Sequence, residues 1–358
     1  MKFEKGVSNM ATTLAERMSK FSGSPTSALI AKVAELKLQG KDIISLNVGE
    51  PDFGTPDYIK VAGMKAIADN FTKYTPGNGI LELRQEIVKK LKQDNGIEYG
   101  LNEITTSVGA KQAIASAMMV IAGPGDEVIL PIPCWVSYTE MIRLAGATPV
   151  FVPVRSDNYE LDLKAIEDAI TPRTKAIIIC TPNNPTGAVY SEESLRKLAE
   201  LAVKHDFFIV ADEIYEKLVY DGAKHFSVAS ISQEVKERTV TVNGFSKAYA
   251  MTGWRIGYAA ARPDVIKGIM AVQSQTTSAT SSISQKAAAA ALRGPQHDME
   301  VMVEEFKRRK DYVVKRLNSI PGIVCPDVKG AFYVYPDVQA YLGKSFGDRK
   351  IETAVDLC

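Results

Sequence analysis

The sequence has few of the residues that metal sites and disulfide frameworks need. Its four cysteines show no CxxC or other ligand spacing, and its three histidines are not clustered. These patterns argue against a zinc module and a disulfide-rich secreted domain. We therefore expect no metal ion, and reduced thiols at Cys134, Cys180, Cys325 and Cys358.

The chain also lacks an excess of charge of one sign and any long apolar run. Lys and Arg total 43 against 42 for Asp and Glu, so we expect no nucleic acid partner. No uncharged apolar segment is long enough to span a bilayer, and the first residues, MKFEKGVSNMATTLAERM, lack the apolar stretch of a secretory signal. We expect no membrane partner and a cytoplasmic location.

Nucleotide-binding glycine motifs are missing as well. Neither GxGxxG nor GxxxxGK[ST] follows a predicted strand, which argues against an ordinary nucleotide-binding domain. With 358 residues, 46% of them apolar and 24% charged, the chain is typical of a globular enzyme with one large α/β domain and a smaller one.

Seven short, β-branched runs predict a sheet. They are EITTSVG, EVILPIP, TPVFVPV, KAIIICTP, FFIVADE, TVTVNG and RIGYAAA, and several lead through a turn into a helical pattern. This alternation predicts a mostly parallel sheet covered by helices on both faces, because parallel strands need helical crossovers. We assign residues 51–293 to this large domain.

The two chain ends, 1–50 and 294–358, are expected to form a smaller α/β domain. MEVMVEEFKRRKDYVVKRLNSI has apolar residues near helical spacing and charges on the other face, so one long amphipathic helix is predicted. The following segment, GIVCPDVKGAFYVYPDV, is expected to supply strands of a second, smaller sheet.

Unusual polar residues follow the predicted strands. Asn184 comes after KAIIIC, Asp212 after FFIV and Lys247 after TVTVNGF, while a helix is predicted to begin within SVGAKQAI. Ligands of open parallel sheets bind outside the carboxyl ends of the strands, so we predict that these residues form one site.

Taken singly, each residue has an ordinary structural explanation. Asp212 and Asn184 could cap helices or turns, and Lys247 could be a solvated loop residue. Arg255 could pair with a carboxylate, and Trp135 could belong to the core.

Together they match what pyridoxal phosphate requires. This cofactor needs an amine for its aldehyde, a carboxylate at its ring nitrogen, donors at its ring oxygen, an aromatic face and a phosphate cradle. A helix N-terminus and a guanidinium suit a phosphate. The residues for these five tasks are, in order, Lys247; Asp212; Asn184 and Tyr215; Trp135; and Gly109, Ala110 and Arg255.

The chain resembles class I aminotransferases of the fold type I pyridoxal phosphate enzymes, and the aspartate-directed branch in particular. The resemblance runs from SPTSALIAKVAELKLQGKDIISLNVGEPDF to the last residues. It rests on YTPGNGILELR, SVGAKQAI, CWVSY, TPNNPTGAVY, ADEIYEKLVY and NGFSKAYAMTGWRIGY, whose order makes the set specific.

The resemblance implies a role for each matching residue. Lys247 would carry the cofactor and act as catalytic base, Asp212 would hold the ring nitrogen protonated, and Tyr215 would donate at the ring oxygen. Tyr74 would reach the cofactor phosphate of a neighbouring subunit, which implies a homodimer with shared sites. Gly49 would lie against the substrate.

The resemblance also implies a substrate, although less specifically. In the aspartate-directed branch the counterpart of Lys111 faces the distal carboxylate of the substrate, and Thr26 would lie on the same side. We expect an L-amino acid donor, aspartate or an aromatic one, and a 2-oxo acid such as 2-oxoglutarate. The cofactor and substrate sites would also share Lys111, Trp135 and Asn184. Lys111 could instead be a solvated first-turn residue.

The chain departs from the family pattern in two places. No arginine after YVYPDV stands where relatives carry the one that grips the substrate α-carboxylate, and the chain stops at IETAVDLC, so we expect C-terminal truncation. Gly244 stands where many relatives have a hydroxyl residue at the phosphate. A β-eliminating C–S lyase on the same fold and a non-catalytic cofactor-binding protein remain alternatives.

Overall fold

The computed structural model describes residues 14–19, 22–23, 25–46 and 48–357. The strands are β1 Ile104–Ser107, β2 Glu127–Ile132, β3 Thr148–Pro153, β4 Thr174–Cys180, β5 Phe208–Asp212, β6 Thr239–Gly244, β7 Gly257–Ala260, β8 Ser345–Phe346 and β9 Arg349–Lys350. The helices are α1 Pro25–Leu38, α2 Asp57–Ala68, α3 Leu81–Asn95, α4 Gly109–Ile121, α5 Ser137–Leu144, α6 Leu163–Ala169, α7 Glu192–His205, α8 Gln233–Arg238, α9 Pro263–Thr276, α10 Ser282–Arg293, α11 His297–Asn318 and α12 Ala354–Leu357.

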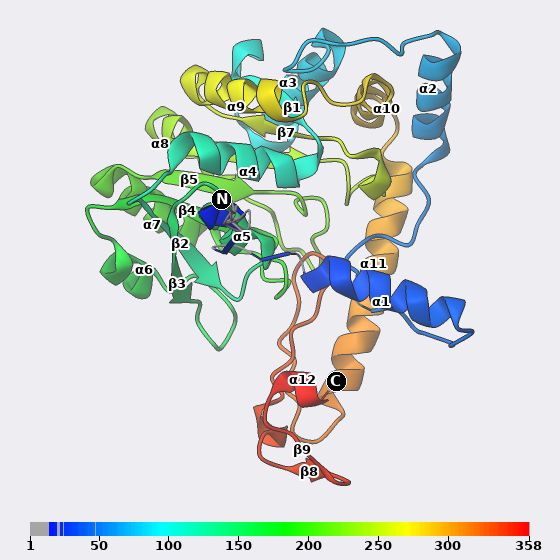
Figure 1. Ribbon diagram of the computed structural model, residues 1–358, viewed down its shortest axis with the longest axis vertical. Helices are drawn as coiled ribbons and strands as arrows, with labels where there is room; N and C mark the ends of the chain where they lie inside the picture. Colours follow the sequence, from blue (N-terminus) through cyan, green and yellow to red (C-terminus); the bar gives the residue numbers. More distant parts are fainter. Residues whose placement is uncertain (1–13, 20–21, 24, 47, 358) are drawn as a thin grey trace, which may run out of the picture.

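The seven predicted β-branched runs form a single sheet in the order β1-β7-β6-β5-β4-β2-β3. Strands β2 to β6 pair in parallel, whereas β7 runs antiparallel to both β1 and β6. The prediction of a mostly parallel sheet is therefore confirmed. The helices between successive parallel strands provide the crossovers that this topology needs (Figure 1).

Two layers of helices cover the sheet, and β4 shows why its sequence is apolar throughout. Ile178 packs with α4, α5 and α9 on one face, whereas Ile177 and Ile179 pack with α6 and α7 on the other. Side chains of a strand alternate between the two faces of the sheet. A strand that is buried on both faces therefore needs apolar residues at every position. At the β1 and β7 edge, a further core joins α2, α3, α10 and α11.

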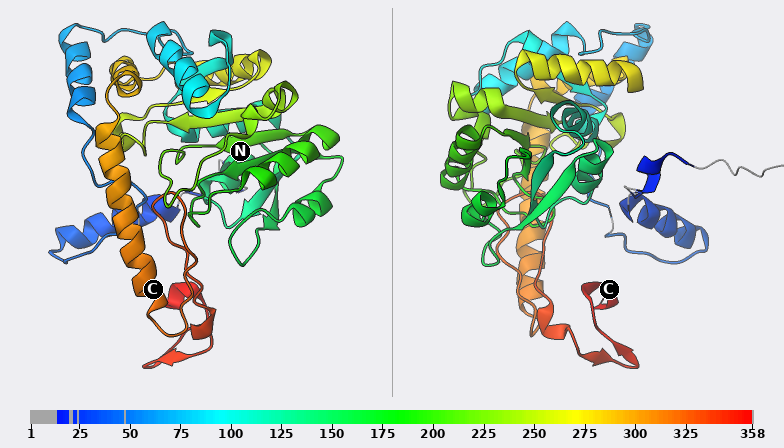
Figure 2. Two further views of the ribbon diagram at one scale, coloured as in Figure 1. Left: turned by 180° about the vertical axis from the view of Figure 1, so that it is seen from behind. Right: turned by 60° about the vertical axis from the view of Figure 1, so that its left-hand side comes forward.

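The predicted long amphipathic helix is α11, and its prediction is confirmed. Met299, Met302, Phe306 and Lys310 are buried at spacings of three to four residues, which places them on one face. This helix runs from the body of the molecule toward the C-terminal segment, and α1 stands apart from the sheet (Figures 1 and 2). None of the helices in the described ranges is both long and apolar enough to cross a membrane.

The segment GIVCPDVKGAFYVYPDV does not form the expected strands. Only isolated bridges occur there, between Val219 and Gly330 and between Val324 and Asp337. Its backbone instead bonds to loops of the large sheet, with the Gly330 N–H donating to Gly187 O and the Ala331 N–H to Leu218 O, both at 2.9 Å. Ala331 has a φ of +56°, which interrupts extended pairing.

The small sheet lies further along the chain, where β8 and β9 form an antiparallel pair. The division into residues 51–293 and the two chain ends stays a prediction.

The packing of α7 makes a stability prediction. Leu198 is fully buried against the sheet, so Leu198→Ala should lower the free energy of unfolding by about 2–5 kcal/mol through lost contacts and a cavity. Leu144→Ala is the matched control, because Leu144 is 45% exposed. Urea unfolding followed by circular dichroism measures both. Equal losses in the two variants would contradict the assigned packing.

Candidate active site

A cavity of about 630 Å³ lies where several strands of the large sheet end. Asp212 ends β5, while Asn184 and Lys247 stand in the turns after β4 and β6. The structure thus brings together side chains that are far apart in the sequence, such as Asn184 and Lys247, which are 63 positions apart. Most of the predicted site residues line this cavity: Gly49, Ala110, Lys111, Trp135, Asn184, Asp212, Tyr215, Lys247 and Arg255.

Lys247 projects its amine into this cavity. Its Nζ donates to the carbonyl oxygen of Gly49 at 2.5 Å, and it lies 5.4 Å from the ring centroid of Phe332 and 5.7 Å from that of Tyr215. Burial is the main cause that lowers the pKa of Lys247 to about 8, and the nearby Arg255 adds to it. An appreciable fraction of the amine is therefore neutral near physiological pH.

Asp212 is the buried carboxylate of the cavity, with 3% of its surface exposed. The Tyr138 hydroxyl donates to its Oδ2 at 2.6 Å, and the Ile214 N–H donates to its Oδ1 at 3.2 Å. Burial raises the pKa of Asp212 to about 6, although the hydrogen bond from Tyr138 opposes the rise. The group is thus mostly ionised at neutral pH.

The start of α4 and Arg255 form a region suited to an anion. The N-cap residue of α4, Val108, provides no side-chain cap, so within the described part of the chain the first N–H groups of the helix are open to a ligand. Among the described residues, the Arg255 guanidinium donates to two carbonyl oxygens, Thr252 O at 2.9 Å and Val108 O at 3.2 Å. A Cβ at Gly109 would lie 2.5 Å from Arg255 Nη2, and the φ of Gly109 is +78°. Only glycine permits this approach.

Two tyrosines and Asn184 close another side of the cavity. The hydroxyls of Tyr215 and Tyr333 lie 2.7 Å apart, and Asn184 Nδ2 donates to Tyr333 Oη at 3.4 Å. A Cβ at Gly49 would come within 2.1 Å of the Tyr333 hydroxyl. Tyr333 can reach the cavity because residue 49 is a glycine and has no side chain.

Trp135 and Lys111 also line the cavity. Lys111 Nζ lies 4.8 Å from the Trp135 ring centroid and donates to Ser137 Oγ at 3.3 Å. Burial, followed by repulsion from Arg255, lowers the pKa of Lys111. This part of the lining thus combines an aromatic face with a cation.

Comparisons with known proteins agree with this geometry. Residues 41–355 match the family described as aminotransferase class I and II. The chain belongs to this family. It is 46% identical to the aspartate aminotransferase of Bacillus sp. strain YM-2 over 330 residues, which cover 92% of the chain and 84% of that relative. It is 45% identical to the aspartate/prephenate aminotransferase of Cereibacter sphaeroides over 341 residues, 94% and 85% of the two chains.

Solved structures confirm that the fold is that of fold type I aminotransferases. The aspartate aminotransferase of Rhizobium meliloti superposes with a TM-score of 0.92 at 42% identity, covering 97% of this chain and 88% of that one. The Thermus thermophilus enzyme with maleate gives 0.88 at 43% identity, covering 92% and 88%. This aminotransferase is therefore an enzyme that transfers amino groups and uses pyridoxal phosphate, the cofactor of its family.

The residues around the cavity of this aminotransferase fit that cofactor. Lys247 offers a partly neutral amine, and Asp212 a buried carboxylate. Arg255 and the uncapped start of α4 offer a cradle that a side chain at residue 109 would fill. This donor set suits an aldehyde, a pyridinium nitrogen and a phosphate, respectively.

Gly109 does not line the cavity itself but lies against Arg255, which does. Tyr74 is not brought to the cavity either. Tyr74 lies between α2 and α3 and is 98% exposed. Thr26 is in α1, but its side chain lies outside the described part of the structure.

Sequence reasoning missed two tyrosines that the structure places at the site. Tyr138 was present in the motif CWVSY but had no assigned task, and Tyr333 stands in the segment expected to form the small sheet. Their contacts join positions 74 and 118 residues apart, from Tyr138 to Asp212 and from Tyr215 to Tyr333. A buried tyrosine needs a partner for its hydroxyl, but local sequence does not name that partner.

The hydrogen bond from Tyr138 makes a pH prediction. Tyr138→Phe removes a donor that stabilises ionised Asp212, so the pKa of Asp212 should rise above about 6. The carboxylate is ionised above its pKa, so the acid limb of the pH–rate profile should move upward by about one unit. Tyr99→Phe, which loses a buried hydroxyl bonded to Thr241, is the control. An acid limb that stays in place in Tyr138→Phe would contradict this role.

Proposed function

We propose that this enzyme moves the amino group of L-aspartate to a 2-oxo acid such as 2-oxoglutarate. The observation that carries the proposal is one cavity in which the amine of Lys247, the buried carboxylate of Asp212 and the side chain of Lys111 converge. The relatives named as aspartate aminotransferases support the choice of substrate.

We assign the cofactor contacts to the cavity residues. Lys247 binds the aldehyde, Asp212 faces the ring nitrogen, and Asn184 and Tyr215 face the ring oxygen. Trp135 covers the ring. The phosphate is held by the first backbone N–H groups of α4, at Gly109, Ala110 and Lys111, by the Arg255 guanidinium, and by Tyr74 of a second copy.

Bound pyridoxal phosphate supplies an aldehyde that captures amines and a ring that accepts electrons. The tasks of the protein are then to hold charge and move one proton. Asp212 provides a fixed negative charge that favours a protonated ring nitrogen. Lys247, whose pKa of about 8 leaves part of it neutral, accepts the proton from the substrate Cα and delivers it again.

Lys111 is proposed to bind the second carboxylate of the substrate. Within the described residues its amine has Ser137 and the Trp135 face as partners and no carboxylate, so its charge is available to an anion. Asn184, Trp135 and Gly49 line the same cavity and are proposed as substrate contacts. Thr26 completes the set.

We also propose a homodimer, located in the cytoplasm, with the large and small domains divided as in the sequence prediction. Val61, Met64 and Ile67 are more than half exposed along one face of α2, at 55%, 60% and 56%. An apolar stripe of this kind usually packs against another surface. A second copy covering α2 would lie close to the exposed Tyr74, which follows that helix.

The reaction itself is the first test. Holoenzyme mixed with aspartate and 2-oxoglutarate should form glutamate, and Lys247→Ala should lose the visible absorption of the linked cofactor and at least about 100-fold in rate. Lys267→Ala, an exposed lysine of α9, is the control. Pyruvate and ammonia from cystathionine, without glutamate from aspartate, would establish the lyase instead.

The role of Lys111 makes a second, separate prediction. Lys111→Ala should raise the KM for aspartate roughly 10- to 100-fold, the loss expected for one charge-assisted contact. The KM for an aromatic amino acid, which has no second carboxylate, should change little. Equal increases for both substrates would argue that Lys111 serves the fold or the phosphate rather than the distal carboxylate.

A further inference from the structure

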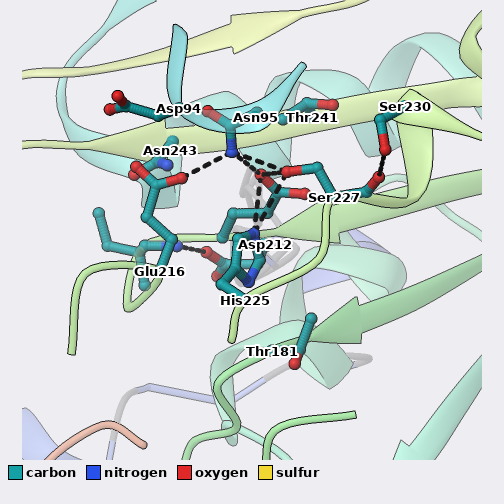
Figure 3. Close-up of polar contacts among 12 residues, drawn as sticks. Asp94, Asn95, Thr181, Asp212, Glu216, His225, Ser227, Ser230, Thr241 and Asn243 are labelled. Atoms are coloured by element: carbon teal, nitrogen blue, oxygen red, sulfur yellow. Dashed lines mark hydrogen bonds and ion pairs between the residues drawn. The ribbon is translucent and has the colours of Figure 1, made fainter. Parts of the chain in front are cut away.

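A buried polar network lies directly behind Asp212, outside the cavity. Asp212, Ile214 and Tyr215 line the cavity, whereas Glu213 and Glu216 do not. Their carboxylates meet polar side chains from α3 and from residues 225–227 (Figure 3). Residues 212–216 carry two proposed cofactor contacts, Asp212 and Tyr215. This segment is thus held by contacts on the side that faces away from the cavity.

Three side chains contact one carboxylate oxygen of Glu213, two through hydrogen bonds and one as an ion pair. Its Oε2 lies 2.8 Å from Ser227 Oγ, 3.3 Å from Asn95 Nδ2 and 3.3 Å from His225 Nε2. Its own N–H donates to Val242 O at 2.8 Å, which ties it to β6. Glu213 is only 1% exposed, and these contacts hold it on both its side chain and its backbone. Since Asp212 is the preceding residue, its backbone is held in place as well.

Glu216 completes the network. It forms a close ion pair with Lys90 of α3, and Asn95 Nδ2 donates to its Oε2 at 2.8 Å. Asn95 therefore contacts the carboxylates of both Glu213 and Glu216. Tyr215 lies between these two glutamates in the sequence. Displacing either carboxylate would move the segment that carries Tyr215.

The charges in the network balance only when His225 is protonated. Lys90 and His225 then supply two positive charges against the two of Glu213 and Glu216. Burial alone lowers the pKa of His225, but the carboxylates of Glu213 and Glu216 outweigh it and raise the pKa above the usual 6.5, while Lys90 opposes them. With His225 neutral, one uncompensated negative charge stands beside Asp212, and the charge of Glu213 raises the pKa of that carboxyl.

His225 lies between the buried carboxylates and a surface cavity. Its loop borders this cavity of about 470 Å³, whose charged lining residues are Glu192, Asp221, Lys224 and Lys329. Three of these are compensated by ion pairs, Glu192 with Arg196, Asp221 with Lys310 and Lys329 with Asp327. The carboxylates that act most on His225 are therefore the buried ones.

We propose that His225 and Glu213 form a positioning pair outside the cavity, which holds Asp212 in place and keeps its carboxyl group ionised. The inference rests on the proposed function of Asp212. Glu213, Glu216 and His225 also bring possible metal-ligand atoms within 4.8 Å of one another. However, Lys90, Asn95 and Ser227 already bind the two carboxylates, which favours a proton network over a cation site.

Titration of the histidine rings tests the pair without any activity measurement. The chain has three histidines, so NMR of ¹³C-histidine-labelled holoenzyme gives three ring signals that His205→Gln, His225→Gln and His297→Gln assign. We expect His225 to titrate above 6.5 and to shift downward in Glu213→Gln, while exposed His205 stays unchanged. A His225 that titrates at or below 6.5 in the unmodified enzyme would overturn the pair, whether or not the variants fold.

The absorption of bound cofactor tests the link to the site. Removing a positive charge favours protonated groups nearby, so His225→Gln should move the pH midpoint of the absorption change upward by roughly half a unit to one unit. Glu213→Gln should move it downward, and the double variant should return close to the original midpoint. A purely structural role predicts no such opposite shifts, and His205→Gln is the matched control.

The two proposals fail in different ways. If the unmodified protein binds pyridoxal phosphate without the absorption of a lysine-linked cofactor, the proposed function fails. If that absorption is present but its midpoint is the same in His225→Gln, Glu213→Gln and the double variant, only the positioning pair fails.

Discussion

The proposed chemistry of this protein depends on an amine and a carboxylate that line one cavity. Burial favours the neutral form of both Lys247 and Asp212. It lowers the pKa of the lysine and raises that of the aspartate. Their mutual attraction opposes both shifts. The pair is consequently poised near neutral pH, the range in which a proton can be both taken and returned.

The fold provides this pair at the carboxyl ends of adjacent parallel strands. β5 and β6 place Asp212 and the turn of Lys247 at the same edge of the sheet, where helix N-termini such as that of α4 also point. Glycines then decide how closely the groups approach, since a side chain at Gly49 or Gly109 would collide with Tyr333 or Arg255. The cavity thus depends on backbone geometry as much as on its polar side chains.

The sequence predicted the sheet because its strands are buried on both faces and read as uninterrupted β-branched runs. It predicted that Lys247, Asp212 and Arg255 belong to one site, because a single cofactor needs an amine, a carboxylate and a cation. It did not predict the path of residues 322–338, whose backbone bonds to loops around Gly187 and Leu218. Neither did it assign Tyr138 or Tyr333 a task, because such contacts arise only when distant segments meet in the folded chain.

The distribution of ion pairs differs between the buried lysines and the cations that line the cavity. The buried lysines Lys90 and Lys310 are each paired with carboxylates, as the cost of burying a charge demands. Within the described residues, the cations of the cavity, Lys111, Lys247 and Arg255, have backbone, hydroxyl or aromatic partners and no paired carboxylate. An excess of positive charge in a cleft attracts anions. The cavity is therefore suited to a phosphate and carboxylates, whereas the carboxylates of Glu213 and Glu216 already have Lys90, Asn95 and Ser227 as partners.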